Sequence, residues 1–456
     1  MNQSHQDTIV ALSTPSGVGA IGVIRLSGME ALALTNKVFR GADLSTVDSH
    51  TIHFGTIRDG DQIIDEVLVS VFIAPKSFTK ENVVEISCHG SNYILKQVIQ
   101  LLVRQGARLA KPGEFTQRAF LNGQFDLAQA EAVADLIASD SAASHQAALN
   151  QMRGGFSQEI RDLRERLVHF ASMIELELDF GEEDVEFASR DELKKLVNEL
   201  LVVINALISS FDLGNVIKNG VPTVIAGKPN AGKSTLLNAL LNEEKAIVSD
   251  IPGTTRDFIE DEMIIEGVSF RFIDTAGIRE TLDAVEKIGV ERTHSKMKEA
   301  SLILFMFDLA NENPQEIHQQ INRLENAGIP YLLVGNKIDT ADPELVDQLK
   351  SDSRWIFISA SHKTHLSELK DRIVEVIHLD NFKTGNTIVT NLRHYESLLH
   401  TKQSLMTVIE SIDKQVTNDF VAMDIRQSLH HLGEITGEIT TDDLLANIFS
   451  KFCIGK

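Results

Sequence analysis

The chain has 456 residues, about three times the ~150 residues of a typical domain, and is long enough for about two to four hydrophobic cores. Its 43 Lys and Arg against 65 Asp and Glu give a formal net charge of -22, so its bulk charge repels nucleic acid and anionic membranes. The length of the chain excludes a single small binding module. The whole acidic excess lies after residue 122, because residues 1–122 carry 11 basic and 11 acidic side chains. A polyanionic partner therefore needs a local basic patch, for which the candidates are Arg153, Arg161, Arg164 and Arg166.

The two cysteines, Cys88 and Cys453, are too few for a disulfide framework or a cysteine metal site, and they fit a reducing compartment. The first basic residue is Arg25, so the N-terminus lacks the charged region that begins a signal peptide. Leu200–Ile208 is too short and too polar to span a bilayer. We therefore predict a cytoplasmic protein with no membrane span.

Residues 1–122 combine short β-rich runs with one amphipathic helix and many glycine-containing turns. The β-rich runs are Ala20–Leu26, Glu66–Ile73 and Val83–Ser87, and the helical pattern covers Tyr93–Gln105. This combination predicts a compact α+β domain.

Residues 126–211 are rich in Ala, Leu, Glu and Gln with a period of 3.6 residues, broken at Gly154-Gly155 and near Gly181. Helical periodicity returns at Asn391–Glu410 and Phe420–Phe449. We therefore predict one α-helical domain formed from two chain segments, 123–219 and 380–456.

Between these segments, residues 220–379 alternate apolar strands with helical patterns, which predicts a parallel sheet with helices on both faces. The predicted strands are Val221–Ala226, Val268–Ile273, Leu302–Phe307, Tyr331–Val334 and Ile356–Ile358. The fold class is thus multidomain, α/β and α, with an α/β domain inserted into the helical domain.

A phosphate-binding loop, Gly227-Lys-Pro-Asn-Ala-Gly-Lys-Ser234, follows the first of these strands and precedes the helical stretch Thr235–Leu241. In such a loop, backbone amides surround the β-phosphate, Lys233 reaches the β- and γ-oxygens, and the Ser234 hydroxyl binds Mg²⁺. The nucleotide-binding residues predicted here are Asn230, Ala231, Gly232, Lys233, Ser234 and Thr235.

The base is specified by Asn336-Lys337-Ile-Asp339, which follows the strand Tyr331–Val334. The Asp339 carboxylate can accept hydrogen bonds from N1–H and N2–H₂ of guanine, whereas adenine offers no such pair of donors. Ser359-Ala360 supplies a further loop against the base. The predicted ligand is therefore GTP.

Asp274-Thr275-Ala276-Gly277 ends the strand Val268–Ile273, where the carboxylate can orient Mg²⁺ through water and the glycine can approach the γ-phosphate. These motifs occur in the order of the Ras-like GTPase fold. Position 278 is Ile instead of the Gln that commonly orients the attacking water. Glu280, Asp283 and Glu286 are the candidates for that role, and spacing alone does not choose among them.

The loop before the second strand contains two threonines where a Mg²⁺-binding threonine is expected. Its Arg256 either acts as a finger in cis or pairs with Asp257. The GTP-binding residues predicted in this loop are Ser249, Asp250, Ile251, Pro252, Gly253, Thr254 and Thr255, with Thr255 as the Mg²⁺ ligand beside Ser234.

Three motifs in the second half of the chain are distinctive: Gly253-Thr-Thr-Arg-Asp257, Asp274-Thr-Ala-Gly-Ile-Arg-Glu280 and Phe452-Cys-Ile-Gly-Lys456. Four stretches near the N-terminus add to them: Ala20–Gly28, Ser77–Thr79, His89-Gly90 and Arg108–Asn122. Through these motifs the sequence resembles the bacterial tRNA modification GTPases of the MnmE/TrmE family over essentially its whole length.

The resemblance implies a GTPase that is activated by K⁺ and by dimerisation of the GTPase domains. It places the K⁺ ligands at Asn230, Ser249, Ile251 and Thr254, and the water-orienting carboxylate at Glu286. A monovalent cation at that place offsets γ-phosphate charge as a guanidinium would.

The resemblance also implies a folate-binding and dimerising N-terminal domain, with 5-formyl- or methylene-tetrahydrofolate as cofactor. The corresponding residues are Arg25, Glu85, Gln124 and Lys456, and Gln124 stands where relatives can have a lysine. The implied activity is addition of a carboxymethylaminomethyl group to carbon 5 of the wobble uridine (U34) of certain tRNAs. The resemblance further implies that a homodimer performs this reaction with a flavin-dependent partner protein, in a heterotetramer or larger complex. Cys453 is expected to be a packed or folate-proximal thiol.

Two other hypotheses remain. One is an RNA- or ribosome-associated GTPase switch without its own modification chemistry. An RNA-binding appendage of the KH type would show strands and a Gly-x-x-Gly loop with basic flanks. In this sequence, Gly433–Gly437 lies instead in an acidic helical stretch. The other is a folate aminomethyltransferase regulated by the GTPase domain, which would turn over folate without a flavoprotein.

Overall fold

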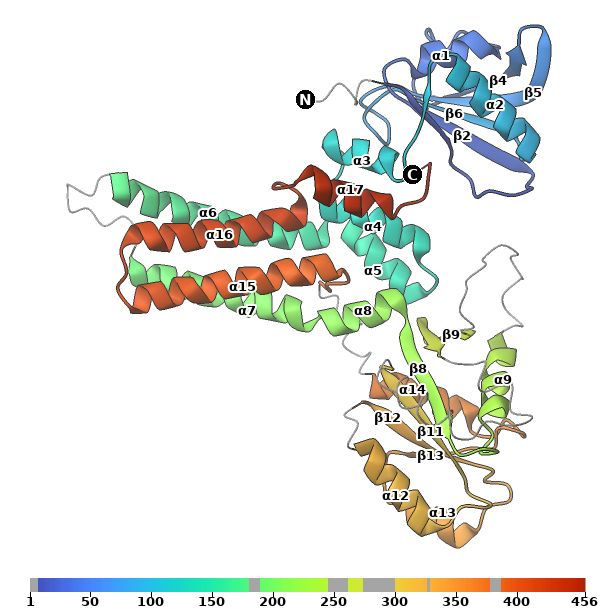
Figure 1. The fold of residues 1–456 in the computed structure, drawn as a ribbon, viewed down its shortest axis with the longest axis vertical. Coiled ribbons are helices and arrows are strands. Elements are labelled where there is room, and N and C mark those ends of the chain that lie inside the picture. Colours follow the sequence, from blue (N-terminus) through green and yellow to red (C-terminus); the bar gives the residue numbers. More distant parts are fainter. Residues whose placement is uncertain are drawn as a thin grey trace. The chain divides into compact units, whose positions relative to one another are not determined.

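The computed structural model describes residues 7–179, 189–244, 261–273, 300–325, 329–377 and 387–455 (Figure 1). The chain divides into two compact units. Unit 1 contains Met1–Ala138, Ala148–Asn205 and Glu396–Lys456, and unit 2 contains Ser139–Ala147 and Ala206–Tyr395. Two of the boundaries between the units fall inside long helices, because α7 (Arg190–Ser209) and α15 (Leu392–Asp413) each contribute residues to both units.

The N-terminal part of unit 1 contains a seven-stranded sheet within the described residues, with the order β3-β4-β5-β6-β2-β1-β7. All neighbouring strands are antiparallel except β1 and β7. The strands are β1 (Ile9–Leu12), β2 (Ile21–Ser27), β3 (Phe39–Arg40), β4 (Thr51–Asp59), β5 (Gln62–Phe72), β6 (Val83–His89) and β7 (Arg108–Leu109). The predicted α+β fold of this region is confirmed.

Helices α1 (Ala31–Val38) and α2 (Asn92–Arg104) cover one face of this sheet. Leu34, Val38, Leu95 and Val98 from the helices pack with Val69 and Ile86 from the strands, because alternate strand residues share one face. The short helix α3 (Glu114–Leu121) packs Phe115 on the opposite face, against Ile9 and Ala11 of β1. Most of that second face therefore has no helix of this core packed on it.

Helices form the rest of unit 1, as the 3.6-residue period predicts. They are α4 (Leu127–Ala138), the second part of α5 (Ala142–Met152), α6 (Gly155–Asp179), most of α7 and α15, α16 (Asn418–Thr436) and α17 (Asp442–Ser450). α6 lies beside α16, and Arg426 pairs with Glu175 between them (Figure 1). α7 is tied to α15 by the ion pair of Lys194 and Asp413. Segments more than 200 residues apart in sequence thus form one helical body.

The arginines proposed as a basic patch are largely neutralised by acidic partners. Arg161 pairs with Asp126 at 3.7 Å, Arg164 with Glu438 at 2.5 Å, and Arg166 with Glu199 at 2.5 Å. These three arginines lie on α6, whereas Arg153 lies between α5 and α6. Neighbouring segments supply acids that the local sequence does not reveal. The structure therefore does not support this stretch as a free surface for a polyanion.

By length and composition, one stretch in the described part of the chain, Arg190–Asn219, qualifies as a candidate membrane span, with 28% of its apolar window buried. This stretch is longer than the Leu200–Ile208 segment considered above. Its buried residues on α7 recur every three or four positions, at Leu193, Val197, Leu200, Ile204 and Leu207. Such a stripe is typical of a helix that packs one face in a bundle.

Unit 2 contains a six-stranded sheet within the described residues, ordered β13-β12-β11-β8-β10-β9. β8 (Val221–Gly227), β10 (Val268–Phe272), β11 (Leu302–Asp308), β12 (Tyr331–Asn336) and β13 (Trp355–Phe357) run parallel. β9 (Asp261–Ile265), which the sequence analysis did not predict, pairs antiparallel with β10. The predicted parallel sheet is confirmed, with one antiparallel edge strand added.

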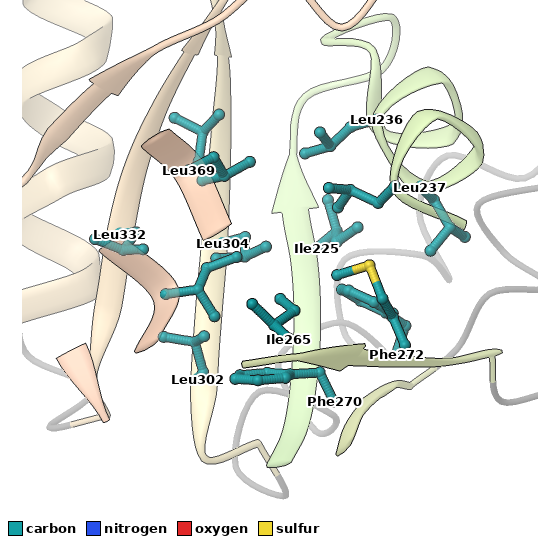
Figure 2. Packing of buried hydrophobic residues seen from close by; sticks show 14 of the residues in the cluster. Ile225, Leu236, Leu237, Ile265, Phe270, Phe272, Leu302, Leu304, Leu332 and Leu369 are labelled. Atoms are coloured by element: carbon teal, nitrogen blue, oxygen red, sulfur yellow. The ribbon is translucent and has the colours of Figure 1, made fainter. Parts of the chain in front are cut away.

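Helices cover both faces of this sheet. α9 (Lys233–Glu244) and α14 (Leu366–Val376) pack on one face, and α12 (Pro314–Glu325) and α13 (Pro343–Leu349) pack on the other. Figure 2 shows Leu236 and Leu237 of α9 lying beside Ile225, with Phe270 and Phe272 of β10 in the same core. Since both faces are buried, ligands can reach this sheet at the ends of its strands.

Candidate functional site

The carboxyl ends of β8, β11, β12 and β13 meet at one edge of the sheet of unit 2, because these strands are parallel. The phosphate loop follows β8, Asp308 ends β11, Asn336 ends β12, and Ser359 follows β13. Motifs separated by more than 100 residues in sequence are therefore brought together at this edge.

The backbone of the phosphate loop adopts conformations that favour glycine. Gly227 has a φ of 143°, Gly232 a φ of 97°, and Asn230 a φ of 63°. A Cβ at Gly227 would lie 2.3 Å from the carbonyl oxygen of Met306 on the neighbouring strand. Glycine is thus required here both for the left-handed turn and for close approach of the loop to β11.

Lys233 begins α9 directly after the loop. Its Nζ donates hydrogen bonds of 2.9 Å to the carbonyl oxygens of Gly227 and Lys228, so the ammonium is held at the mouth of the loop. Burial lowers the pKa of Lys233, because an ammonium loses hydration there. Ser234 and Thr235 follow in the first turn of the helix, where hydroxyls and amides can face an anion.

Asn336 connects the phosphate loop to the loop predicted to contact the base. Its Nδ2 donates to the carbonyl oxygen of Ala231 at 2.8 Å, and its Oδ1 accepts from the backbone N–H of Ala360 at 3.0 Å. The residue is 3% exposed, so these bonds are shielded from water. Three of the predicted binding residues are therefore joined through one buried side chain.

Asp339 lies at the same edge, and a hydrogen bond from Ser359 lowers the pKa of its carboxyl below the ordinary value. His362 Nδ1 lies 3.6 Å from Asp339 Oδ2. Ser359 is itself buried, and its backbone forms a bridge with Thr364. The lowered pKa favours the ionised form, which is the form that could accept two hydrogen bonds from guanine.

Several predicted site residues lie outside the described residues. They are Ser249, Asp250, Ile251, Pro252, Gly253, Thr254, Thr255, Asp274, Thr275, Ala276, Gly277, Glu286 and Lys456. Glu280, Asp283, Arg256 and Asp257 lie outside them as well. β10 runs parallel to β8, so its carboxyl end lies at the edge described above.

The second predicted site lies on the face of the N-terminal sheet that α1 and α2 leave open. Arg25 of β2 and Glu85 of β6 are direct cross-strand partners, and Arg25 Nε donates to Glu85 Oε1 at 2.8 Å. The guanidinium carbon of Arg25 lies 5.7 Å from the ring centroids of both Phe78 and Phe115. The cation is thus fixed between two aromatic rings and a carboxylate.

Gln124 and the C-terminal residues approach the same region of unit 1. Gln124 is exposed directly before Phe125, whose ring lies 5.7 Å from that of Phe78. The Gly113 N–H donates to the carbonyl of Cys453 at 3.3 Å, and the Ser13 hydroxyl donates to the carbonyl of Gly455 at 3.3 Å. Cys453 is exposed, so of the two expectations for this thiol the packed one was wrong, and proximity to the folate stays a prediction.

Phe115 and Arg118 of α3 are neighbours of this site that the sequence analysis did not single out as site residues. Arg118 is 2% exposed and pairs with Asp7, Glu81 and Glu114, and Arg108 pairs with Asp7 and Glu114 as well. This buried network anchors the helix that carries Phe115. An arginine and a glutamate four residues apart on a short helix are the local signal, but the other two acids come from distant segments.

Within the residues that the structure describes, no group of three or more His, Cys, Asp or Glu side chains is arranged to hold a metal ion. The predicted Mg²⁺ and K⁺ ligands in this part of the chain are the Ser234 hydroxyl and the Asn230 amide. A hydroxyl and an amide oxygen are ligands that hard cations accept, so the donor types fit these ions.

Comparisons with known proteins agree with this arrangement. The MnmE helical domain family matches residues 127–453, and the family described as GTP-binding protein TrmE N-terminus matches residues 8–124. The tRNA modification GTPase MnmE of Cytophaga hutchinsonii is 62% identical over 99% of this chain and 98% of its own length. The protein of the same name from Christiangramia forsetii is 52% identical over 99% of both chains.

Among solved structures, the G domain of the T. maritima FeoB transporter is 26% identical. The match covers 34% of this chain and 98% of the FeoB chain, and its TM-score of 0.25 is too low to support a structural argument. The family matches and the full-length identities carry the assignment. The chain belongs to the MnmE family of tRNA modification GTPases, and it hydrolyses GTP in tRNA modification.

Proposed function

We propose that this protein is a K⁺-activated GTPase that acts with a flavin-dependent partner protein in the cytoplasm. Together they add a carboxymethylaminomethyl group to carbon 5 of U34 in certain tRNAs. The observation that carries the nucleotide part is the Asn336 side chain, which joins the phosphate loop at Ala231 to the base loop at Ala360. With the ionised Asp339 beside it, this edge supports a guanine nucleotide over other ligands.

We assign the GTPase role to residues 220–379, folate binding and dimerisation to residues 1–122, and a connecting role to the helical segments 123–219 and 380–456. Mg²⁺ would be held by Ser234 and Thr255, with Asp274 orienting it through water. Hydrolysis would change the conformational state of the complex, and the folate would supply the one-carbon unit.

The K⁺ assignment is supported by Asn230, whose exposed side chain lies on the left-handed turn of the phosphate loop. An amide oxygen there can contribute one ligand, and the loop oxygens of Ser249, Ile251 and Thr254 would contribute the others. The bound cation would stabilise the charge that develops between the β- and γ-phosphates. Glu286 would orient the attacking water, because position 278 is Ile.

The folate assignment is supported by the half-buried Arg25–Glu85 pair, whose side chains are 22% and 26% exposed. A cation and a carboxylate fixed side by side can bind the glutamate tail and the pterin of a tetrahydrofolate. Gly455 packs against the carbonyl of Leu12, next in sequence to Ala11, the cross-strand partner of Arg25. Lys456, the next residue, would complete the site together with Gln124.

The homodimer is supported by the apolar side chains on the same open sheet face. Phe54 and Leu68 are direct cross-strand partners, and Ile52 shares their face because it lies two residues before Phe54. Phe54 is 67% exposed, Ile52 66% and Leu68 48%. A second copy covering this face would remove these groups from water beside the Arg25–Glu85 pair.

Steady-state GTP hydrolysis in KCl and in NaCl at equal ionic strength tests the proposal, since it needs neither tRNA nor partner. We expect fast turnover in KCl alone, loss of the K⁺ effect in Asn230→Ala, and loss of turnover in Glu286→Ala. Asp347→Ala, an exposed acid on α13 that pairs with Lys350, is the matched control and should behave as the unchanged protein. Equal slow rates in both salts would refute K⁺ activation.

Reconstitution with the flavoprotein, tRNA and folate separates this proposal from the two other hypotheses. Modified U34 should form only in the complete mixture. Folate turnover without the flavoprotein would favour an aminomethyltransferase, and hydrolysis without any modified uridine would favour a GTPase switch. Residues 392–450 form helices α15 to α17, which supports the proposal over a switch with a C-terminal KH appendage.

A further inference from the structure

Asp308 is a buried carboxylate at the end of β11 that none of the recognised GTPase motifs includes. Its Oδ2 lies 2.6 Å from Nζ of Lys337, the lysine between Asn336 and the base-binding Asp339. The Asp308 side chain is 9% exposed and that of Lys337 is 34% exposed. We propose that Asp308 is a positioning residue for GTP, which fixes Lys337 and so orders the guanine-binding segment before the nucleotide arrives.

Asp308 is itself held rigidly. Its Oδ1 accepts from the backbone N–H of Ala310 at 3.1 Å, and its Oδ2 accepts from Asn311 Nδ2 at 2.9 Å. Burial alone would raise the pKa of Asp308, but the hydrogen bonds from Lys337 and Asn311 outweigh it and lower the pKa below its ordinary value. A fixed anion thus stands at the end of the strand beside β12.

The neighbouring strand places Lys337 within reach of this anion. Asp308 and Asn336 are partners in the parallel register of β11 and β12, and the Leu309 N–H donates to the carbonyl of Asn336 at 3.1 Å. Lys337 has a φ of 64°, a left-handed conformation that is costly for a residue with a Cβ. The ion pair on one side and the Asn336 bridge on the other hold the backbone in this conformation.

The same loop also contacts the phosphate-binding segment. Glu312 Oε1 accepts from the Asp308 N–H at 3.1 Å, and Glu312 Oε2 lies 3.4 Å from Nζ of Lys228 in the phosphate loop. The connection between β11 and α12 therefore contacts both halves of the nucleotide site. Within this connection, Asp308 is the residue that contacts Lys337 of the guanine-binding segment.

Preorganisation explains why the pair matters for binding. A lysine has four rotatable side-chain bonds and loses that freedom when a ligand orders it. With Asp308 holding the ammonium, the loss occurs on folding and not on binding, so affinity increases without a new contact to the ligand. The effect should appear in nucleotide affinity and KM, while the rate of the bound complex should stay nearly constant.

The test is a double-mutant cycle on nucleotide affinity, measured by calorimetry with GDP. Asp308→Asn keeps an acceptor for Ala310 but removes the charge, and Lys337→Met keeps an aliphatic stem but removes the ammonium. We expect each single variant to weaken GDP binding by about tenfold, and the double variant to bind no more weakly than the singles. The KM for GTP should rise by a similar factor in Asp308→Asn, with kcat changed less than twofold.

Two controls separate positioning from a general loss of structure. Asp352→Asn removes an ion pair with Arg354 before β13, at the opposite end of that strand, and should leave GDP affinity unchanged. Competition by inorganic pyrophosphate, which has no base, should be the same for Asp308→Asn and the unchanged protein.

Additive effects in the cycle, unchanged GDP affinity in Asp308→Asn, or an equal loss of pyrophosphate binding would each overturn the proposal. Should Asp308→Asn give no cooperative thermal transition, Asp308→Ser replaces it in the cycle. Its hydroxyl can still accept from the nearby backbone, as serine does in turns. The same tenfold loss and the same non-additivity with Lys337→Met are expected.

Discussion

The two candidate sites of this protein are built on sheets in different ways. In unit 2 both faces of the sheet are buried, and the nucleotide site consists of loops that follow the strands at one edge. In unit 1 one face of the sheet is open, and Arg25 and Glu85 are single residues on adjacent strands of that face. An edge site takes its residues in consecutive runs, whereas a face site takes one residue from each strand.

This difference also affects how each site is stabilised. The edge site depends on backbone conformation, with left-handed residues and carbonyl groups bound by Lys233 and Asn336. The face site depends on side chains packed behind it, chiefly Phe115 on α3 and the buried Arg118 network. A change behind the face should therefore act on folding, and a change at the edge should act on binding.

The largest effect is expected for Arg118→Met. Removing this arginine leaves Glu81 without its arginine partner and leaves Asp7 and Glu114 with Arg108 alone, and breaking a buried ion pair costs about 3–5 kcal/mol. Denaturant unfolding of unit 1 should show this loss of unfolding free energy. Arg104→Met breaks an exposed pair with Asp59 and should cost less than about 1 kcal/mol. Equal losses of unfolding free energy in the two variants would show that the Arg118 network contributes no more than an exposed ion pair.

At the edge site, Lys233→Met should lower kcat/KM for GTP by at least about a hundredfold, because it removes the cation that we propose contacts the β- and γ-phosphates. The melting temperature without nucleotide should be at least as high as before. Burial lowers the pKa of Lys233, so the folded state holds its charged form at a cost that methionine avoids. A clear drop in melting temperature would show that the lysine is part of the scaffold.

On the open face, Glu85→Gln should weaken binding of 5-formyl-tetrahydrofolate by about tenfold, because the charge that fixes Arg25 is lost while the shape is kept. Equilibrium dialysis measures this, and GTP hydrolysis should change less than twofold. Glu66→Gln, an exposed acid on the same face of β5, is the matched control. Unchanged folate binding in Glu85→Gln would show that the Arg25–Glu85 pair is not part of the proposed folate site.

The smallest effect is the acid sensitivity of unit 1. Ion pairs with arginine lower the pKa values of Asp7 and Glu114, against the opposing effect of burial. The unfolded chain therefore binds protons more readily, and the stabilisation should be complete above the ordinary values of 3.8 and 4.5 and lost as the pH falls through the lowered ones. Unfolding free energies between pH 7 and pH 3 should fall less steeply in Arg118→Met; parallel curves would contradict the assignment.

The edge site can be predicted from the sequence because its chemistry lies in contiguous runs. Lys233, Asn336 and Asp339 follow from the glycine pattern, the strand before each motif and the hydrogen-bonding groups of guanine. Asp308 did not follow, since its partner lies 29 residues away and becomes visible only when β11 and β12 pair in register.

For the open face, the alternation of β2 and β6 gives the strands but not their pairing. Arg25 and Glu85 are 60 residues apart, and only the resemblance to a family singled them out. Because pairing between distant residues is not visible in the sequence, the arginines of α6 were expected to form a basic patch. Their acidic partners, Asp126, Glu199 and Glu438, come from three other segments of unit 1.

The buried Asn336 amide makes the phosphate loop and the loop at Ala360 depend on each other. A Cβ at Gly232 would lie 2.2 Å from Asn336 Nδ2, so any side chain at this phosphate-loop position displaces the residue that holds the base loop at Ala360. A substitution classed by its motif as a phosphate-binding defect would then alter discrimination between bases. Likewise, a phosphate loop transplanted from another GTPase will carry its affinity with it only if the recipient supplies an asparagine in the same place.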